Sequence, residues 1–176
     1  MTALTERFER AAQAEMLRRL SKVLDQTALR ILREGLRRAG ADEGTLWMAS
    51  RDGKELIPVF NSGPDPDCFL ARVRQPLDRG VISMVYHSGQ PFCENDVTKN
   101  ASHDHTVDEA LRQVTAAMIA LPFFFGGRRR GVLSCVRLGH GEFEARHLSE
   151  LQQSANLLER LADWHLLQEL LDTDPS

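Results

Sequence analysis

The segment 121–138, which reads LPFFFGGRRRGVLSCVRL, constrains the fold of this chain more than any other stretch. Two apolar runs flank the pair Gly126-Gly127, and Gly131 opens the second run. Apolar runs on either side of a glycine turn are typical of a β-hairpin. We expect the three arginines at positions 128–130 to face water. The chain is therefore expected to contain a β-sheet, with this hairpin as part of its scaffold.

A second hairpin is expected nearer the N-terminus. Residues 44–50 and 55–60 read as strands, and Asp52-Gly53 between them is a dipeptide favoured in tight turns. Between the two hairpins the sequence predicts a mixed series of elements: a strand or turn at 68–75, a helix at 81–87 ended by Gly89, a strand at 91–93, an irregular segment at 95–106 and a helix at 107–116.

Long helices are predicted at both ends of the chain. From Leu4 to Ala39 apolar residues recur with helical spacing, and Gly40 is placed to end that helix. A second helix is predicted from Phe143 to Leu171. It carries two neighbouring stripes, one made of Leu157, Leu161, Trp164, Leu167 and Leu171 and the other of Leu151, Ala155, Leu158 and Ala162. An antiparallel sheet between long helices is an α+β arrangement.

The two terminal helices together present more apolar surface than one side of a small sheet can cover. A surplus of this kind predicts a homodimer that forms through a helical bundle. The residues expected at its interface are Leu17, Leu20, Leu24, Ile31, Leu157, Leu161 and Trp164.

The net charge of −3 conceals an asymmetry between the two ends. Residues 1–40 hold nine Lys or Arg and five Asp or Glu, a balance of +4, whereas residues 139–176 hold two and eight, a balance of −6. Acidic residues interleave with the arginines of the first segment, which is not the pattern of a nucleic-acid-binding patch. The complementary charges instead predict that the two segments lie next to each other, and no nucleic-acid partner is expected.

The composition is that of a globular domain. Apolar residues make up 42% of the 176 residues and charged residues 27%. No apolar run approaches the roughly 20 residues that span a bilayer, so no membrane contact is expected. The charged N-terminus does not resemble an export signal. The odd number of cysteines, Cys68, Cys93 and Cys135, then favours reduced thiols in a bacterial cytoplasm.

Five local features occur in the order found in one known family. They are the strand Gly44–Met48, the helix start at Gly80 with the Gly89-Gln90-Pro91 turn at its end, Asp96-Val97, the hairpin Pro122–Leu133, and Phe143 before the last helix. In these features the sequence resembles the GAF domain family over about residues 20–166.

The resemblance implies a GAF/PAS-like α+β fold. A central antiparallel sheet would carry the long terminal helices on one face and a helix and loop lid, made from residues 68–116, on the other. The corresponding division of the chain is a helical extension at 1–19, the GAF-like domain at 20–171 and a tail at 172–176.

The resemblance also implies a small-molecule pocket between the sheet and the lid. The residues expected to bind a ligand are Trp47, Phe60, Ile82, Tyr86, Asp96, His103 and His105. Imidazole and carboxylate groups suit Zn or Fe, but the His103-Asp104-His105 sequence has no defined third ligand. No metal is therefore predicted, the cofactor is left unknown, and haem ligation by His103 or His105 stays open.

Three specialised branches of the family match the sequence poorly. Free methionine sulfoxide reductases use lid cysteines. Cys68 and Cys93 lie in the expected lid segment, but that branch's cysteine pattern and its Trp-Ala-Gly-Phe strand are both absent. Bilin-binding domains need a lid-helix cysteine, which residues 107–116 lack. The Asn-Lys pair of the cyclic-nucleotide branch is reversed here, as Lys99-Asn100.

The sequence is therefore interpreted as a non-enzymatic regulatory sensor domain that acts alone. It is expected to bind a small molecule or a partner signalling protein and to dimerise through its terminal helices. Two alternatives remain, a thiol-based enzyme and an interaction module with a collapsed pocket. In the second alternative, large side chains fill the cavity themselves; the candidates are Trp47, Met48, Phe60, Phe123 and Phe125.

Overall fold

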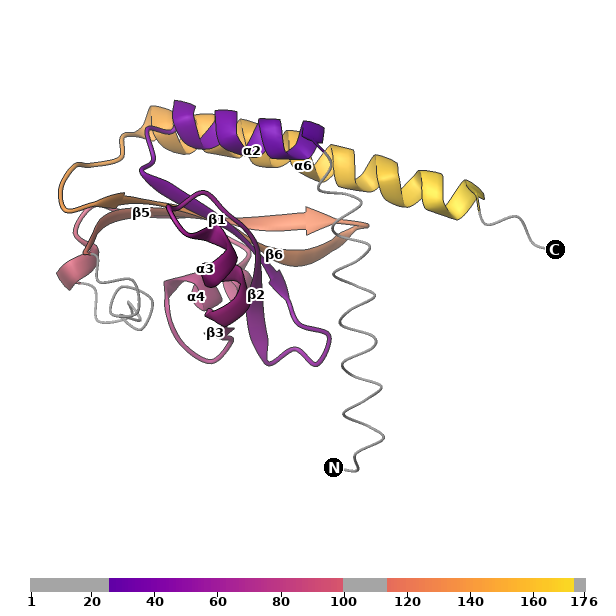
Figure 1. The fold of residues 1–176 in the computed structure, drawn as a ribbon, viewed down its shortest axis with the longest axis horizontal. Coiled ribbons are helices and arrows are strands. Elements are labelled where there is room, and N and C mark those ends of the chain that lie inside the picture. The colour runs from indigo at the N-terminus through magenta and orange to yellow at the C-terminus, as the bar shows by residue number, and fades with distance from the viewer. Residues whose placement is uncertain (1–25, 100–113, 173–176) are drawn as a thin grey trace, which may run out of the picture.

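The computed structural model of the chain describes residues 26–99 and 114–172. Its centre is an antiparallel sheet with the strand order β3-β2-β1-β6-β5-β4 (Figure 1). The strands are β1 (Glu43–Ala49), β2 (Glu55–Asn61), β3 (Gln75–Pro76), β4 (Phe92–Glu94), β5 (Thr115–Phe125) and β6 (Arg128–Leu138). Both predicted hairpins are present, β1–β2 and β5–β6.

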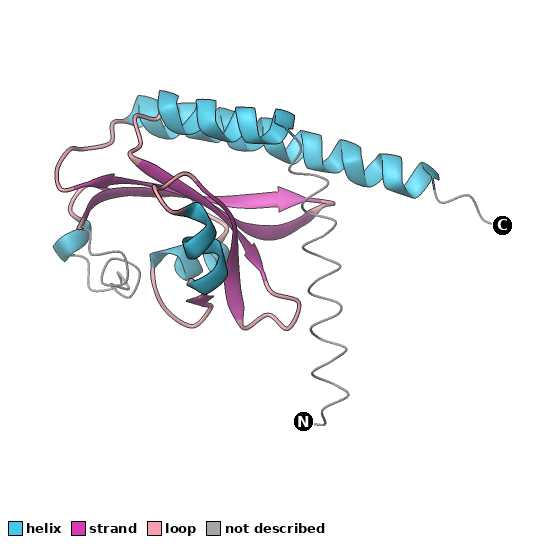
Figure 2. Ribbon diagram, viewed as in Figure 1, coloured by secondary structure: helices cyan, strands magenta, loops and turns pink. Residues whose placement is uncertain are grey.

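Helices cover both faces of the sheet, as Figure 2 shows in cyan. The long helices α2 (Gln26–Arg38) and α6 (Ala145–Asp172) lie side by side on one face. The short helices α3 (Pro66–Arg72) and α4 (Val81–Ser88) lie on the other, and the 3-10 helix η1 (Val97–Lys99) follows β4. The α+β arrangement with helices on one face and a lid on the other is confirmed.

The two faces of the sheet carry separate hydrophobic layers. We call the layer under α2 and α6 the helix-side layer; it includes Leu32, Leu36, Ile119, Leu133 and Leu151. The layer under α3 and α4 is the lid-side layer; its buried members are Trp47, Leu56, Phe69, Leu77, Val81, Ile82, Val85, Val97, Met118, Ala120 and Val132. Alternation along the strands divides neighbouring residues between the two layers.

The buried stripe of α6 is the one with the smaller side chains. Leu151, Ala155 and Leu158 belong to the helix-side layer, and Ala162 is buried as well. Helix α2 contributes Ala28, Leu32 and Leu36, and it ends before Gly40, which adopts a left-handed φ of 63°. The helices approach so closely that a Cβ atom on Gly35 would lie 2.4 Å from Ser154 Oγ.

Three sequence-based boundaries change. Residues 66–72 form helix α3 rather than a strand or turn, because Asp65 Oδ1 accepts a hydrogen bond from Cys68 N at 3.2 Å and Pro66 occupies the first turn. Strand β5 begins at Thr115, so the last two residues of the helix predicted at 107–116 belong to a strand instead. Residues 107–113 lie outside the described part. Asp172, assigned to the tail, belongs to α6, and the extension 1–19 lies outside the described residues.

Candidate functional site

The first candidate site is the lid-side layer, where the predicted pocket was expected. Helix α4 is fixed over it by the segment that precedes it. Ser83 Oγ donates to the carbonyl of Pro76 at 2.6 Å, and His87 Nε2 lies 2.9 Å from the carbonyl oxygen of Leu77. Gly89 ends the helix with a left-handed φ of 67°. These contacts place Ile82 and Val85 against the sheet.

Trp47 belongs to this layer and is only 2% exposed. Its Nε1 donates to Ser134 Oγ at 2.9 Å, and its ring meets Phe69 edge-on with centroids 5.8 Å apart. Beside it, Asn61 Nδ2 donates to Thr45 Oγ1 at 3.0 Å, and Thr45, Asn61 and Ser134 are all buried. Trp47 is thus held by packing and by a buried hydrogen bond, as a core residue is.

Tyr86 joins the layer from the last turn of α4 and is half-buried. The guanidinium of Arg129 lies 5.1 Å from the centre of its ring, which is within cation–π range. Arg129 comes from β6, so this contact ties the end of α4 to the hairpin. Of the seven predicted ligand-binding residues, the structure gathers Trp47, Ile82 and Tyr86 into the lid-side layer.

The placement of Phe60 beside these residues is wrong, because Phe60 lies in the helix-side layer. The cause is a β-bulge in the β1–β2 pairing, where Trp47 pairs with Pro58 and Leu46 pairs with Phe60. Val59 is therefore an extra residue, and it reverses the alternation that would have put Leu56, Pro58 and Phe60 on one face.

Asp96 lies at the start of η1, next to Val97 in the lid-side layer. Its carboxylate pairs with Lys99 Nζ at 2.5 Å, and this contact raises the pKa of Lys99. His103 and His105 lie outside the described residues. Among the residues that the structure describes, no group of three His, Cys, Asp or Glu side chains is arranged to hold a metal.

Two of the three cysteines share a row on the helix-side face. Cys93 pairs with Ile119, and Ile119 pairs with Cys135, so the Cα atoms of the two cysteines stand two strands, roughly 10 Å, apart. A disulfide needs a much shorter Cα separation. Burial raises the pKa of Cys135 to about 12, and burial together with Glu94 raises the pKa of Cys93. Both shifts disfavour the reactive thiolate.

The second candidate site is the exposed face of α6. Leu157, Trp164 and Leu167 are 53%, 57% and 47% exposed, and Leu161 beside them is partly buried against the helix-side layer. These four residues, which we call the α6 stripe, follow helical spacing and share one side of the helix. Among the other predicted interface residues, Ile31 packs partly against the helix-side layer, and Leu17, Leu20 and Leu24 lie outside the described part.

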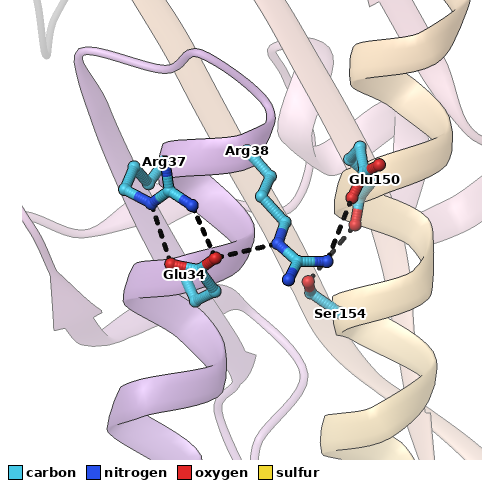
Figure 3. A network of polar contacts seen from close by, with 5 residues as sticks. All are labelled: Glu34, Arg37, Arg38, Glu150 and Ser154. Atoms are coloured by element: carbon cyan, nitrogen blue, oxygen red, sulfur yellow. Dashed lines mark hydrogen bonds and ion pairs between the residues drawn. The ribbon is translucent and has the colours of Figure 1, made fainter.

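Charged residues join α2 to α6 at the opposite end from the α6 stripe. Figure 3 shows Glu34 held by Arg37 and Arg38, with Arg38 reaching Glu150 on α6 at 3.7 Å. The two arginines lower the pKa of Glu34 to about 2. The basic helix therefore lies beside the acidic one, as the charge asymmetry predicts. The pairs are exposed, so their contribution to stability is small.

The sequence agrees with this architecture. A family model described as a GAF domain matches residues 21–161. The chain belongs to the GAF domain family. GAF domains are generally ligand-binding regulatory domains. No curated protein matches the sequence. None of the described helices combines the length and the apolar character needed to cross a membrane.

Solved structures share the GAF fold with this chain. Residues 122–287 of a methyl-accepting chemotaxis protein superpose with a TM-score of 0.67 at 22% identity, over 86% of this chain and 97% of that one. The GAF domain of a phosphoenolpyruvate-protein phosphotransferase from Coxiella burnetii has a TM-score of 0.64 at 15% identity, over 81% and 96%. Free methionine-R-sulfoxide reductase from Neisseria meningitidis, solved with its substrate, has a TM-score of 0.64 at 24% identity, over 90% and 92%.

Proposed function

We propose that this GAF domain is a cytoplasmic regulatory sensor that responds to a small molecule or a partner protein through its lid side. Its output is a homodimer formed by the terminal helices. The observation that carries this proposal is the α6 stripe, which leaves large apolar side chains in water on the face away from the sheet. The usual regulatory role of GAF domains and the similarity to a fragment of a methyl-accepting chemotaxis protein support it.

The stripe suits a second copy of the same chain. Exposed apolar side chains in one row along a helix are stabilised when a like row packs against them. In a two-fold dimer the same patch serves both subunits, so one stripe supplies both halves of the interface. Leu157, Trp164 and Leu167 are exposed, and the sheet contacts of α6 are made mainly by its other stripe, so dimer formation leaves those contacts in place.

Native mass spectrometry of the full chain tests the dimer and the ligand together. We expect the purified protein at twice its 19.8 kDa, with a mass excess from a retained small molecule. Trp164→Glu places a charge in the stripe and is expected to raise the dimer dissociation constant at least about 100-fold. Met84→Glu, an exposed apolar residue on α4, is the matched control and should stay dimeric.

A monomeric wild type, or a Trp164→Glu variant as dimeric as the Met84→Glu control, would contradict the dimer. A dimer with no mass excess would instead favour the alternative of a partner-binding module whose lid-side layer is filled by its own side chains. The enclosed position of Trp47 is the feature of this layer that supports that alternative.

A thiol-based reductase is the second candidate, and the similarity to the Neisseria meningitidis enzyme favours it. The raised pKa values of Cys93 and Cys135 weigh against it, as does their separation across two strands. We expect no reduction of free methionine sulfoxide by the wild type above the rate of a Cys93→Ser variant. Activity that disappears with Cys93→Ser while Cys135→Ser retains it would establish the enzyme.

A further inference from the structure

The tip of the β5–β6 hairpin, residues 124–129, is bonded to α6 by two carboxylates. Glu159 Oε1 accepts a hydrogen bond from Phe124 N at 2.8 Å, and Asp163 Oδ1 accepts one from Gly126 N at 2.6 Å. Glu159 and Asp163 are one helical turn apart, so both point to the same side of α6. In Figure 1 the end of the hairpin lies beneath α6.

The position of these two amides explains why they need partners outside the sheet. The β5–β6 register shifts between Phe123 and Phe124, so the regular ladder is interrupted just before the tip. Gly126 follows at the turn with a left-handed φ of 59°. Carboxylate acceptors make stronger hydrogen bonds to backbone amides than neutral groups do. The hairpin tip is therefore fixed to α6 rather than only to itself.

The same tip also contacts the lid side through α4. Phe124 pairs with Arg129 across the hairpin, and Arg129 stacks over Tyr86 at 5.1 Å. Arg129 Nη1 and the Phe124 ring both lie within 4.0 Å of the Cβ position at Gly89, the residue that ends α4. One short segment thus contacts the end of the lid helix on one face of the sheet and α6 on the other.

Glu159 and Asp163, which we call the carboxylate clamp, lie next to the residues of the α6 stripe in the sequence. Asp163 immediately precedes Trp164, and Glu159 lies between Leu157 and Leu161. The two carboxylates thus bond the hairpin tip to the same turns of α6 that carry the stripe. Burial, together with Asp163, raises the pKa of Glu159 although the Phe124 amide opposes this effect. The Phe124 amide therefore bonds a carboxylate whose charged form costs free energy to bury.

We propose that the hairpin tip couples the lid helix α4 to the turns of α6 that carry the stripe. The hydrogen bonds to Glu159 and Asp163 attach the tip to α6, and we call this coupling the joint. This inference rests on the proposed function for its purpose, since it assigns the route by which the lid side would alter the dimer. The coupling itself does not depend on whether the chain dimerises, because it only requires that a change at Tyr86 reaches α6 across the sheet.

Hydrogen exchange on the full chain tests the joint, with four variants compared to the wild type. Asp163→Ala is expected to speed exchange at least about 10-fold in residues 124–128 and in residues 157–167. Tyr86→Ala removes the ring under Arg129 on the lid side, and it should speed exchange in the same α6 turns, which lie on the other face of the sheet (Figure 1). Asp52→Ala is the control, because it removes the acceptor for Ser50 Oγ and Lys54 N in the other hairpin and should leave α6 unchanged.

Asp163→Asn keeps an acceptor oxygen and should restore most of the protection that Asp163→Ala loses. If Tyr86→Ala leaves residues 157–167 at the wild-type rate, the joint does not exist. If Asp52→Ala affects α6 as strongly as Tyr86→Ala, the effect is general destabilisation and the proposal also fails. Light scattering on the same samples gives the oligomeric state, so a monomeric wild type would contradict the dimer while the exchange data still decide the joint.

Discussion

Replacing Gly131 with alanine is expected to lower the free energy of unfolding by at least about 3 kcal/mol, the upper end of what overpacking usually costs. A Cβ atom there would lie 1.9 Å from the carbonyl oxygen of Trp47 and 3.1 Å from Met48 Sδ. The oxygen belongs to the backbone of the neighbouring strand, so it cannot rotate away. Gly131 pairs with Met48 on β1 and with Phe123 on β5, and both pairings would have to shift.

Gly127→Ala is the matched control in the same hairpin. A Cβ atom on Gly127 meets nothing within 4 Å, but its φ of 67° is left-handed. Its expected cost is therefore only the backbone strain of about 1–2 kcal/mol. Urea unfolding followed by circular dichroism measures both variants. A Gly131→Ala variant no less stable than Gly127→Ala would mean that β1 and β6 do not approach as closely as described.

Local sequence patterns were sufficient to predict the elements in which the spacing of apolar residues matches the period of the helix or strand that forms. The paired glycines at 126–127 between apolar runs indicated β5 and β6, and the 3-4 spacing indicated the long helices. Helix α3 carried a local signal too, an Asp cap followed by proline, which the strand-or-turn interpretation overlooked. Each of these signals depends on a few neighbouring residues and therefore can be found without the tertiary structure.

The face of the sheet or helix on which a side chain lies was harder to predict than the type of element that carries it. The face occupied by Phe60 depends on the bulge at Val59, and the bulge depends on how β2 pairs with β1. Both stripes of α6 have helical spacing, so periodicity alone cannot say which one covers the sheet. The structure buries the stripe with two alanines, Ala155 and Ala162, which let the helix lie close to the sheet. The bulkier stripe with Trp164 is left in water.

The carboxylate clamp was absent from the sequence-based interpretation, although it has a sequence signal. Glu159 and Asp163 are like charges one turn apart, a spacing that destabilises an isolated helix. Such a pair in a helix facing a sheet suggests that donors from elsewhere in the fold compensate for the repulsion. The donors here are backbone amides of the hairpin, which no side-chain pattern reveals.

Replacing Trp47 with alanine is expected to lower the free energy of unfolding by about 3–5 kcal/mol, the range for a large aromatic residue removed from a core. The indole is 2% exposed, packs against Phe69 and donates to the buried Ser134 hydroxyl. If Trp47 instead lined an open ligand cavity, water already in that cavity would solvate its ring. Truncation would then cost about 1 kcal/mol or less, as at a surface position.

A double-mutant cycle separates the hydrogen bond from the packing. Trp47→Phe leaves the Ser134 hydroxyl without its donor, and Ser134→Ala leaves the buried indole N–H unpaired, at about 1–3 kcal/mol each. The double variant removes both polar partners and should be more stable than the sum of the two losses predicts. Strict additivity in urea unfolding would show that the pair does not form. A favourable coupling would make Trp47 a fixed wall of the lid-side layer, so that a ligand entering there must bind beside it, toward Ile82 and Tyr86.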